Sequence, residues 1–145
     1  MYLLDTDTLI YSLKGDSAVK KNLRDHFHDP LKMSVITLME LYYGAYKSQK
    51  IASNLAKIKT LELSFEIIPI GEESAEIFGM TKAQLEKAGL ILDDLDLIIA
   101  SCALTNNLVL VTNNVRHFQR IEGLKLTNWT EYPPSSHKLT SESKD

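Results

Sequence analysis

The sequence predicts an α/β fold built on a mostly parallel sheet of four to five strands. Short apolar runs alternate along the chain with longer stretches of helical spacing, which is typical of βαβ units. The run at residues 108–111 is apolar at every position, so we expect a central strand covered on both faces. No internal repeat is present in the sequence, and its 145 residues suit one domain.

In the first half of the chain, capping residues and breaks separate the expected elements. Thr6 or Asp7 can cap the first helix, a Gly-Asp-Ser break ends it, and Thr37 can start the helix that follows the second strand. In chain order we expect a strand at 2–5, helices at about 6–13 and 17–27, a strand at 32–36, and helices at about 37–47 and 51–63.

The second half continues the alternation. We expect a strand at 65–69, a helix at 72–88 that ends at Gly89, and a helix from Asp93 or Asp94 to 106. Two further strands are expected at 108–111 and 125–127. From Glu131 onward the chain has no apolar pattern and contains two consecutive prolines. We therefore expect one domain over residues 1–130 and a disordered tail at 131–145.

Composition narrows the setting of the protein without identifying a function. No apolar run approaches the roughly 20 residues that span a bilayer, so we expect no membrane partner. The single cysteine, Cys102, cannot form an internal disulfide, and its apolar neighbours predict a core position in a reducing cytoplasm. The net charge of −3 provides no overall attraction to nucleic acid, which would need a local basic patch or a bound cation.

Three acidic residues, Asp5, Glu40 and Asp96, lie in apolar surroundings where carboxylates are rarely found unless they are paired or bind a cation. Asp5 ends the first strand, at the edge where open α/β sheets hold their ligands, although it could equally serve as a helix N-cap. Glu40 could close a capping box with Thr37. Asp96 shares a helix face with small apolar residues, and capping would fall more naturally to Asp93 or Asp94, so its functional interpretation is the strongest of the three.

Converging carboxylates favour a divalent metal site. Two of them about 4 Å apart repel by roughly 4 kcal/mol at an effective dielectric constant near 20, so a cluster would partly protonate unless a cation neutralised it. Oxygen ligands suit Mg²⁺ or Mn²⁺, and the four histidines show no zinc spacing. Hydrolysis by metal-activated water is the natural chemistry of such a site.

Polar residues directly follow the strand at 108–111 and are expected at the same edge of the sheet. Thr112 and Asn114 are candidates for additional site residues that hold a water or the scissile phosphate, although Thr112 could simply cap the next turn. Arg116 and His117 are candidates for contacts with a phosphate backbone.

Taken together and in this order, these segments resemble the PIN-domain ribonucleases, most closely the VapC-type toxins of bacterial type II toxin–antitoxin systems. The matching segments are YLLDTDTLI at 2–10, SVITLMELYYG at 34–44, LDLIIA at 95–100, LVTNNVRHF at 110–118 and GLKLTNW at 123–129. Each motif alone is weak evidence for the family. The first four motifs together, in the order and spacing of the family, are specific, and the segment at 123–129 resembles the family's last strand.

The resemblance implies a three-layer α/β/α PIN fold and an endoribonuclease that uses Mg²⁺ or Mn²⁺ to hydrolyse RNA. It also implies a homodimer that is held inactive by a small VapB-like antitoxin, whose tail occupies the active site. Transferred by motif, Asp5 and Asp96 are direct metal ligands, and Glu40 supports a ligand or orients the attacking water.

One position departs from the family pattern. Many relatives have a fourth acid two residues after the motif threonine, where this chain has Asn114. An amide oxygen can bind a cation but adds no charge, so we predict one metal ion rather than two. Asp93 or Asp94 could compensate for the missing charge, or could only cap their helix.

Two other functions remain open from the sequence. Asp5 and Asp7 match the two aspartates of the D-x-D-x-T signature of haloacid-dehalogenase-type phosphatases, although that function would leave Glu40 and Asp96 unused. A non-enzymatic dimeric binding protein, whose acids only cap helices, is the other alternative.

Overall fold

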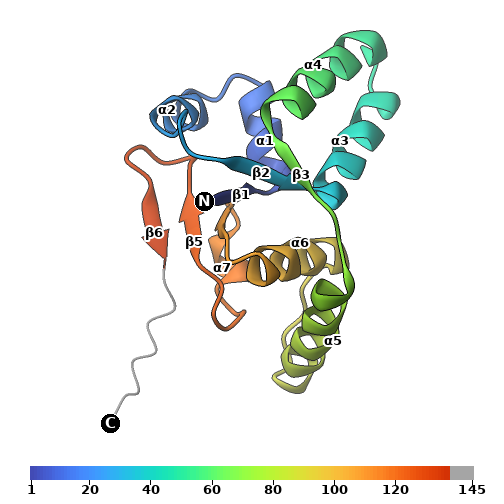
Figure 1. Ribbon diagram of the computed structural model, residues 1–145, viewed down its shortest axis with the longest axis vertical. Helices are drawn as coiled ribbons and strands as arrows, with labels where there is room; N and C mark the ends of the chain where they lie inside the picture. Colours follow the sequence, from blue (N-terminus) through green and yellow to red (C-terminus); the bar gives the residue numbers. More distant parts are fainter. Residues whose placement is uncertain (138–145) are drawn as a thin grey trace.

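A six-stranded sheet forms the centre of the computed structural model, which describes residues 1–137 (Figure 1). The strands are β1 (Tyr2–Leu4), β2 (Leu31–Ser34), β3 (Glu66–Ile68), β4 (Val109–Val111), β5 (Leu126–Asn128) and β6 (Ser135–His137). The helices are α1 (Thr6–Leu13), α2 (Ser17–Asp25), α3 (Val35–Lys47), α4 (Ile51–Ser64), α5 (Glu72–Lys87), α6 (Asp94–Thr105) and α7 (Val115–Phe118). The strand order is β3-β2-β1-β4-β5-β6, with the first five strands parallel and β6 antiparallel to β5.

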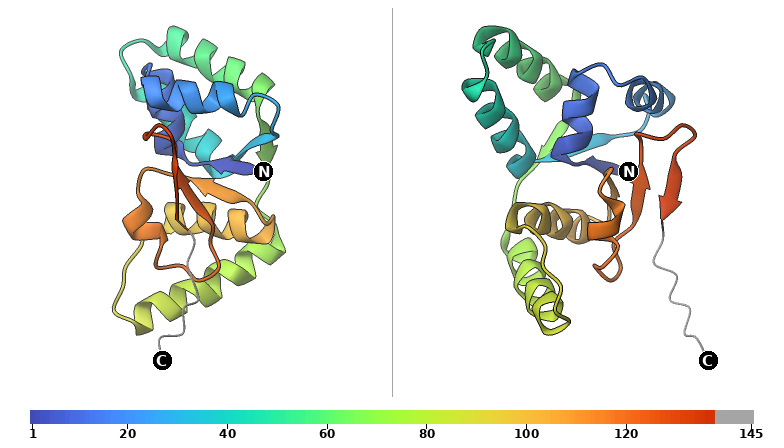
Figure 2. Two further views of the ribbon diagram at one scale, coloured as in Figure 1. Left: turned by 90° about the vertical axis from the view of Figure 1, so that its left-hand side faces the viewer. Right: turned by 180° about the vertical axis from the view of Figure 1, so that it is seen from behind.

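Helices cover both faces of the sheet, as Figures 1 and 2 show. Successive strand residues alternate between two apolar clusters, as the pleat requires: Leu3 and Leu110 belong to one, Leu4 and Val111 to the other. The first cluster packs under α5, α6 and α7, and the second packs under α1, α3 and α4. The expected three-layer α/β/α architecture with a mostly parallel sheet is therefore confirmed.

The order of the strands creates a topological switch point between β1 and β4. From β1 the chain builds outward through β2 to β3, and it then returns to the other side of β1 to add β4 and β5. Ligand crevices in open α/β sheets lie outside the carboxyl ends of the strands at such a point. Here those ends are followed directly by Asp5, after β1, and by Thr112, after β4.

The start of α3 differs from the sequence-based expectation by two residues. Ser34, not Thr37, is the N-cap: its hydroxyl accepts a hydrogen bond from the Thr37 amide at 3.1 Å. This cap forces the β-branched Val35 and Ile36 into the first helical turn, although their intrinsic preference is for a strand. A similar shift applies to α1, because Asp5 rather than Thr6 or Asp7 caps it.

The segment expected to begin a disordered tail is ordered as far as the structure describes it. Residues 135–137 form β6, which pairs with β5, and the side-chain amide of Asn22 donates to the carbonyls of Trp129 and Glu131 at 3.0 and 2.9 Å. Strand β6 was not expected from the sequence, because backbone pairing at a sheet edge needs no apolar pattern. Residues 138–145 lie outside the described residues.

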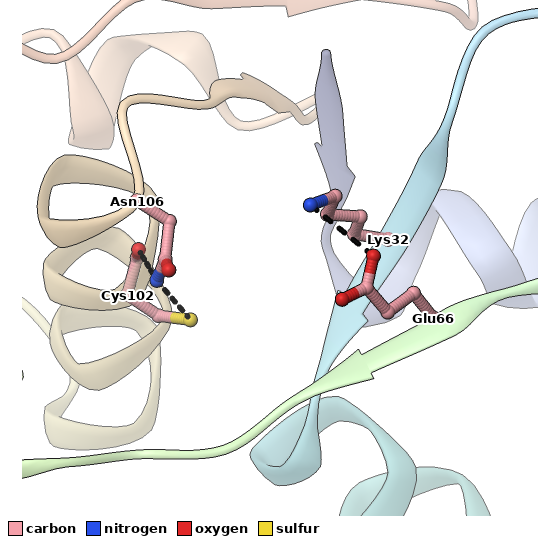
Figure 3. Close-up of polar contacts among 4 residues, drawn as sticks. All are labelled: Lys32, Glu66, Cys102 and Asn106. Carbon is pink, nitrogen blue, oxygen red and sulfur yellow. Dashed lines mark hydrogen bonds and ion pairs between the residues drawn. The ribbon is translucent and has the colours of Figure 1, made fainter.

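Figure 3 shows polar contacts that fix two elements of this frame. Lys32 on β2 and Glu66 on β3 are register partners, and their side chains form an ion pair of 3.2 Å. At the end of α6 the side-chain amide of Asn106 donates to the Cys102 carbonyl at 2.8 Å. Cys102 is fully buried as predicted, and burial raises the pKa of its thiol to about 11. Within the described residues no helix is both long and apolar enough to cross a membrane.

Candidate active site

Asp5 is held at the carboxyl edge of the sheet, at the switch point. Its amide donates to the Val111 carbonyl at 3.0 Å, which extends the β1–β4 ladder by one bond beyond the strands. Its carboxylate accepts from the Thr8 amide at 2.9 Å and also from the Thr112 hydroxyl. The side chain is only 5% exposed, and burial raises the pKa of the carboxyl from 3.8 to about 6 against the opposing hydrogen bonds. Asp5 thus caps α1 and also carries a destabilised negative charge.

Glu40 is oriented by a chain of hydroxyl groups and not by a capping box. The Thr6 hydroxyl donates to Glu40 Oε1 at 2.7 Å and lies 3.2 Å from the Thr37 hydroxyl, which is itself 3.4 Å from that of Ser34. The proposed bond from Glu40 back to the Thr37 amide is absent, because Ser34 accepts from that amide. Glu40 therefore links α3 to the first turn of α1, beside Asp5.

Asp96 lies in the first turn of α6, partly buried, with the cap supplied by Asp93. The Asp93 carboxylate accepts from the amides of Leu95 and Asp96 at 3.0 and 3.4 Å, so the Asp96 side chain has no capping role. The pKa of the Asp96 carboxyl is raised to about 6, first by burial and then by nearby negative charges.

The identity of those charges shows which acids converge. In decreasing order, Asp93, Asp5, Glu40 and Asp7 raise the pKa of Asp96. They come from the loop before α6, the end of β1, α3 and α1, so segments distant in sequence meet at one edge of the sheet. The three predicted acids are therefore brought into electrostatic contact, together with Asp7 and Asp93.

Thr112 and Asn114 lie at the same edge. Thr112 is fully buried; its hydroxyl accepts from the Asn114 amide at 3.0 Å and donates to Asp5. Thr112 therefore both caps the following turn and contacts a site carboxylate. Arg116 and His117 are exposed on α7, the short helix that begins directly after Asn114.

Asp94 takes a different position from the other acids. Its carboxylate forms a 3.0 Å ion pair with Lys82 on α5, and it is not among the charges that act on Asp96. Of the two residues that the sequence offered as compensation for Asn114, the geometry favours Asp93.

The donor chemistry of the site fits a divalent cation. Within the described residues no three acidic, histidine or cysteine side chains are close enough together to enclose a metal ion. Mg²⁺, however, is usually held by one or two carboxylates and keeps several waters. Asp5 and Asp96 satisfy that requirement: burial is the main cause of the raised pKa of each, and nearby negative charges add to it, so a cation would stabilise the charged form of both.

Two residues of this site were missed from the sequence. Thr6 orients Glu40, and Thr8 binds Asp5 through its amide and the Val111 carbonyl through its hydroxyl at 3.2 Å. Both are buried. The signal that could have identified them is the alternation of two threonines with two acids directly after the apolar run at 2–4.

Comparison with known proteins identifies the family of the chain. A model of the PIN domain matches residues 2–124. Ribonuclease VapC2 of Rickettsia felis is 37% identical over 131 residues, which cover 89% of this chain and 98% of the relative. The tRNA(fMet)-specific endonuclease VapC of Salmonella typhimurium is 34% identical over 131 residues, covering 88% and 97% of the two chains.

Solved structures give the same assignment. VapBC2 from Rickettsia felis, bound to a DNA fragment from its promoter, contains a chain that superposes with a TM-score of 0.84 at 36% identity, covering 88% of this chain and 98% of that one. VapBC-1 from Haemophilus influenzae gives a TM-score of 0.82 at 33% identity, covering 90% and 98%. The chain therefore belongs to the PIN-domain family, and among PIN domains to the VapC ribonuclease toxins of VapBC toxin–antitoxin systems. Neither the phosphatase nor the inert binding protein is supported by these relatives.

Proposed function

We propose that this chain is an endoribonuclease toxin that hydrolyses RNA phosphodiester bonds with the help of Mg²⁺ or Mn²⁺. The observation that carries the proposal is the convergence of Asp5, Glu40 and Asp96 at the β1–β4 switch point, where the charges of Asp5 and Glu40 add to burial in raising the pKa of Asp96. The similarity to ribonucleases over almost the whole chain supports the same activity.

Each site residue has a role that its environment supports. Asp5 and Asp96 hold the cation, because both are buried enough to gain from its charge. The hydrogen bond from Thr6 keeps the Glu40 carboxylate in one orientation, so that it can position the attacking water and accept its proton. When bound, the cation polarises the scissile phosphate and activates that water.

The loop after β4 serves the substrate side of the site. Thr112 lowers the pKa of Asp5 through its hydroxyl and so keeps that carboxylate available for the cation. Asn114 supplies an amide beside the phosphate, and the exposed Arg116 and His117 contact the RNA backbone. We expect the site to bind one cation, because Asn114 adds no negative charge that would hold a second one.

The proposal extends to partners. Relatives have been solved as VapBC complexes, and we expect a small VapB-like antitoxin whose tail occupies the acidic site and neutralises it with a basic side chain. We also expect a homodimer that acts in the cytoplasm.

RNA cleavage by matched variants tests the proposal. Wild type, Asp96→Asn and Asp94→Asn are incubated with total tRNA and with initiator tRNA, because the Salmonella relative is named for tRNA(fMet). We expect cleavage by wild type and by Asp94→Asn with Mg²⁺ or Mn²⁺, and none after chelation or by Asp96→Asn. Equal cleavage by Asp96→Asn, or cleavage that persists with chelator, would contradict the proposed site.

A further inference from the structure

A tyrosine next to the acidic residues has no role in the chemistry above. Tyr11 lies on α1, one helical turn beyond Asp7 and Thr8, so it shares their face of the helix. Asp7 is one of the charges that act on both Asp5 and Asp96, and Thr8 binds Asp5. Tyr11 is therefore placed at the rim of the site, and its side chain remains 38% exposed.

The loop that carries Thr112 holds this tyrosine from the other side. The Asn113 side-chain amide donates to the Tyr11 hydroxyl at 3.3 Å, across 102 positions of sequence. Asn113 stands between Thr112 and Asn114, both proposed site residues. The contact thus fixes an exposed aromatic ring relative to the acid-bearing end of β1 and the loop after β4.

Asn113 keeps this position at an energetic cost. Its Oδ1 is buried and finds no hydrogen-bond partner within the described part of the chain. Turning the amide over would exchange its oxygen and nitrogen and would still leave one of them unpaired. A buried, unsatisfied polar atom destabilises a fold by about 1–3 kcal/mol, so a reason other than stability is expected.

Other exposed tyrosines lack this combination of features. Tyr43 and Tyr46 are more exposed, but within the described residues no hydrogen bond or ring contact joins either of them to a loop of the site. Tyr132 is exposed and its hydroxyl is tethered, to Asp25 at 2.7 Å, but Asp25 ends α2, which leads back to the amino end of β2. Tyr132 is therefore a natural control for an exposed, tethered tyrosine away from the site.

We propose that Tyr11, held by Asn113, is a stacking platform for an RNA base adjacent to the scissile phosphate. The inference rests on the proposed ribonuclease function and makes Tyr11 a residue that binds and positions the substrate. Single-stranded bases stack on aromatic side chains, and the fixed ring would hold one base in register with the phosphate at the acids. The stacked base does not take part in the reaction, so we expect it to bind equally well in the ground state and in the transition state. Loss of the stacking contact should therefore change KM more than kcat.

The test combines protein variants with abasic substrates. Cleavage of initiator tRNA is first mapped with the wild-type chain, and abasic nucleotides are then placed singly at the three positions on each side of the cut. Wild type, Tyr11→Phe, Tyr11→Ala and the control Tyr132→Ala are assayed on each substrate, with kcat and KM measured separately.

We expect Tyr11→Ala to raise KM roughly 5- to 150-fold, the range measured for single stacked bases, with kcat within about twofold. One abasic position should raise KM for wild type and Tyr132→Ala and should have no further effect on Tyr11→Ala. Tyr11→Phe, which keeps the ring and loses the tether, should lie between wild type and Tyr11→Ala.

Two results would overturn the inference in distinguishable ways. If wild type cleaves RNA but no abasic position loses its effect in Tyr11→Ala, the stacking role is wrong and the nuclease function stands. If wild type cleaves no RNA with either cation, the proposed function fails and this inference fails with it. If Tyr11→Ala does not fold, the abasic series on wild type still tests the inference, which is overturned if no abasic nucleotide beside the cut raises KM.

Discussion

Replacing Asp5 by asparagine is expected to abolish RNA cleavage and, in metal-free protein, to stabilise the fold. Burial raises the pKa of Asp5 from 3.8 to about 6, which at 1.36 kcal/mol per pH unit makes its charge cost about 3 kcal/mol at neutral pH. Asparagine keeps the oxygen that accepts from the Thr8 amide, so the cap of α1 survives. Burying the new N–H groups costs about 1 kcal/mol, which leaves a net gain of about 2 kcal/mol.

The sign of this effect depends on pH. The unfolded chain releases the Asp5 proton near pH 3.8, whereas the folded protein keeps it until about pH 6. Between those values the folded state binds more protons, so the free energy of unfolding of wild type falls as pH rises and becomes level above pH 6. The asparagine variant loses this titration, so it should be about 1 kcal/mol less stable than wild type below pH 4, where only the cost of its buried N–H groups remains, and about 2 kcal/mol more stable above pH 6.

Urea denaturation in chelator between pH 4 and pH 7.5 measures this difference. The single, buried Trp129 reports unfolding by fluorescence. Asp16→Asn is the matched control, because Asp16 caps α2 through an equivalent 2.9 Å bond from the Val19 amide but lies outside the acidic cluster. A variant that is less stable than wild type at pH 7.5, or a gain that does not change with pH, would refute the reasoning.

Three further changes have defined outcomes. Glu40→Gln should lower kcat by about 10²- to 10⁴-fold, the usual contribution of a general base. The control Asp94→Asn should keep kcat within a few-fold of wild type, and equal kcat values for the two variants would contradict the role of Glu40. Thr6→Val removes the hydroxyl that orients Glu40 and should lower kcat about 10- to 100-fold without loss of folding, as judged by circular dichroism. Trp129→Ala should lower the free energy of unfolding by about 3–5 kcal/mol in urea titrations, since Trp129 is 1% exposed and packs in the core, and a change below 1 kcal/mol would show that the core tolerates its loss.

The elements of the sheet could be predicted because apolar runs and helical spacing reflect burial directly. The run at 108–111 predicted a central strand, and β4 lies between β1 and β5. The start of α3 could not be placed from propensity alone, because Val35 and Ile36 favour strands and only the Ser34 cap makes them helical. Strand β6 was missed because an edge strand is held by backbone bonds to β5, which leave no mark in side-chain pattern.

The candidate site was predictable where an acid interrupts an apolar stretch, as Asp5, Glu40 and Asp96 do. The role of Asp94 was not, because its partner Lys82 is on another helix and the pairing arises only in the folded state. The same limit applies to the bond between Thr6 and Glu40, which spans 34 positions of sequence. Sequence identifies the charges, and tertiary structure decides which of them face one another.

Calorimetric titration of the chain with Mn²⁺ tests most directly whether the converging acids share one cation. We predict one binding site per chain in wild type and in Asp94→Asn, and loss of that site in both Asp5→Asn and Asp96→Asn. Two tight sites per wild-type chain, or unchanged binding by either asparagine variant of the site, would contradict this account.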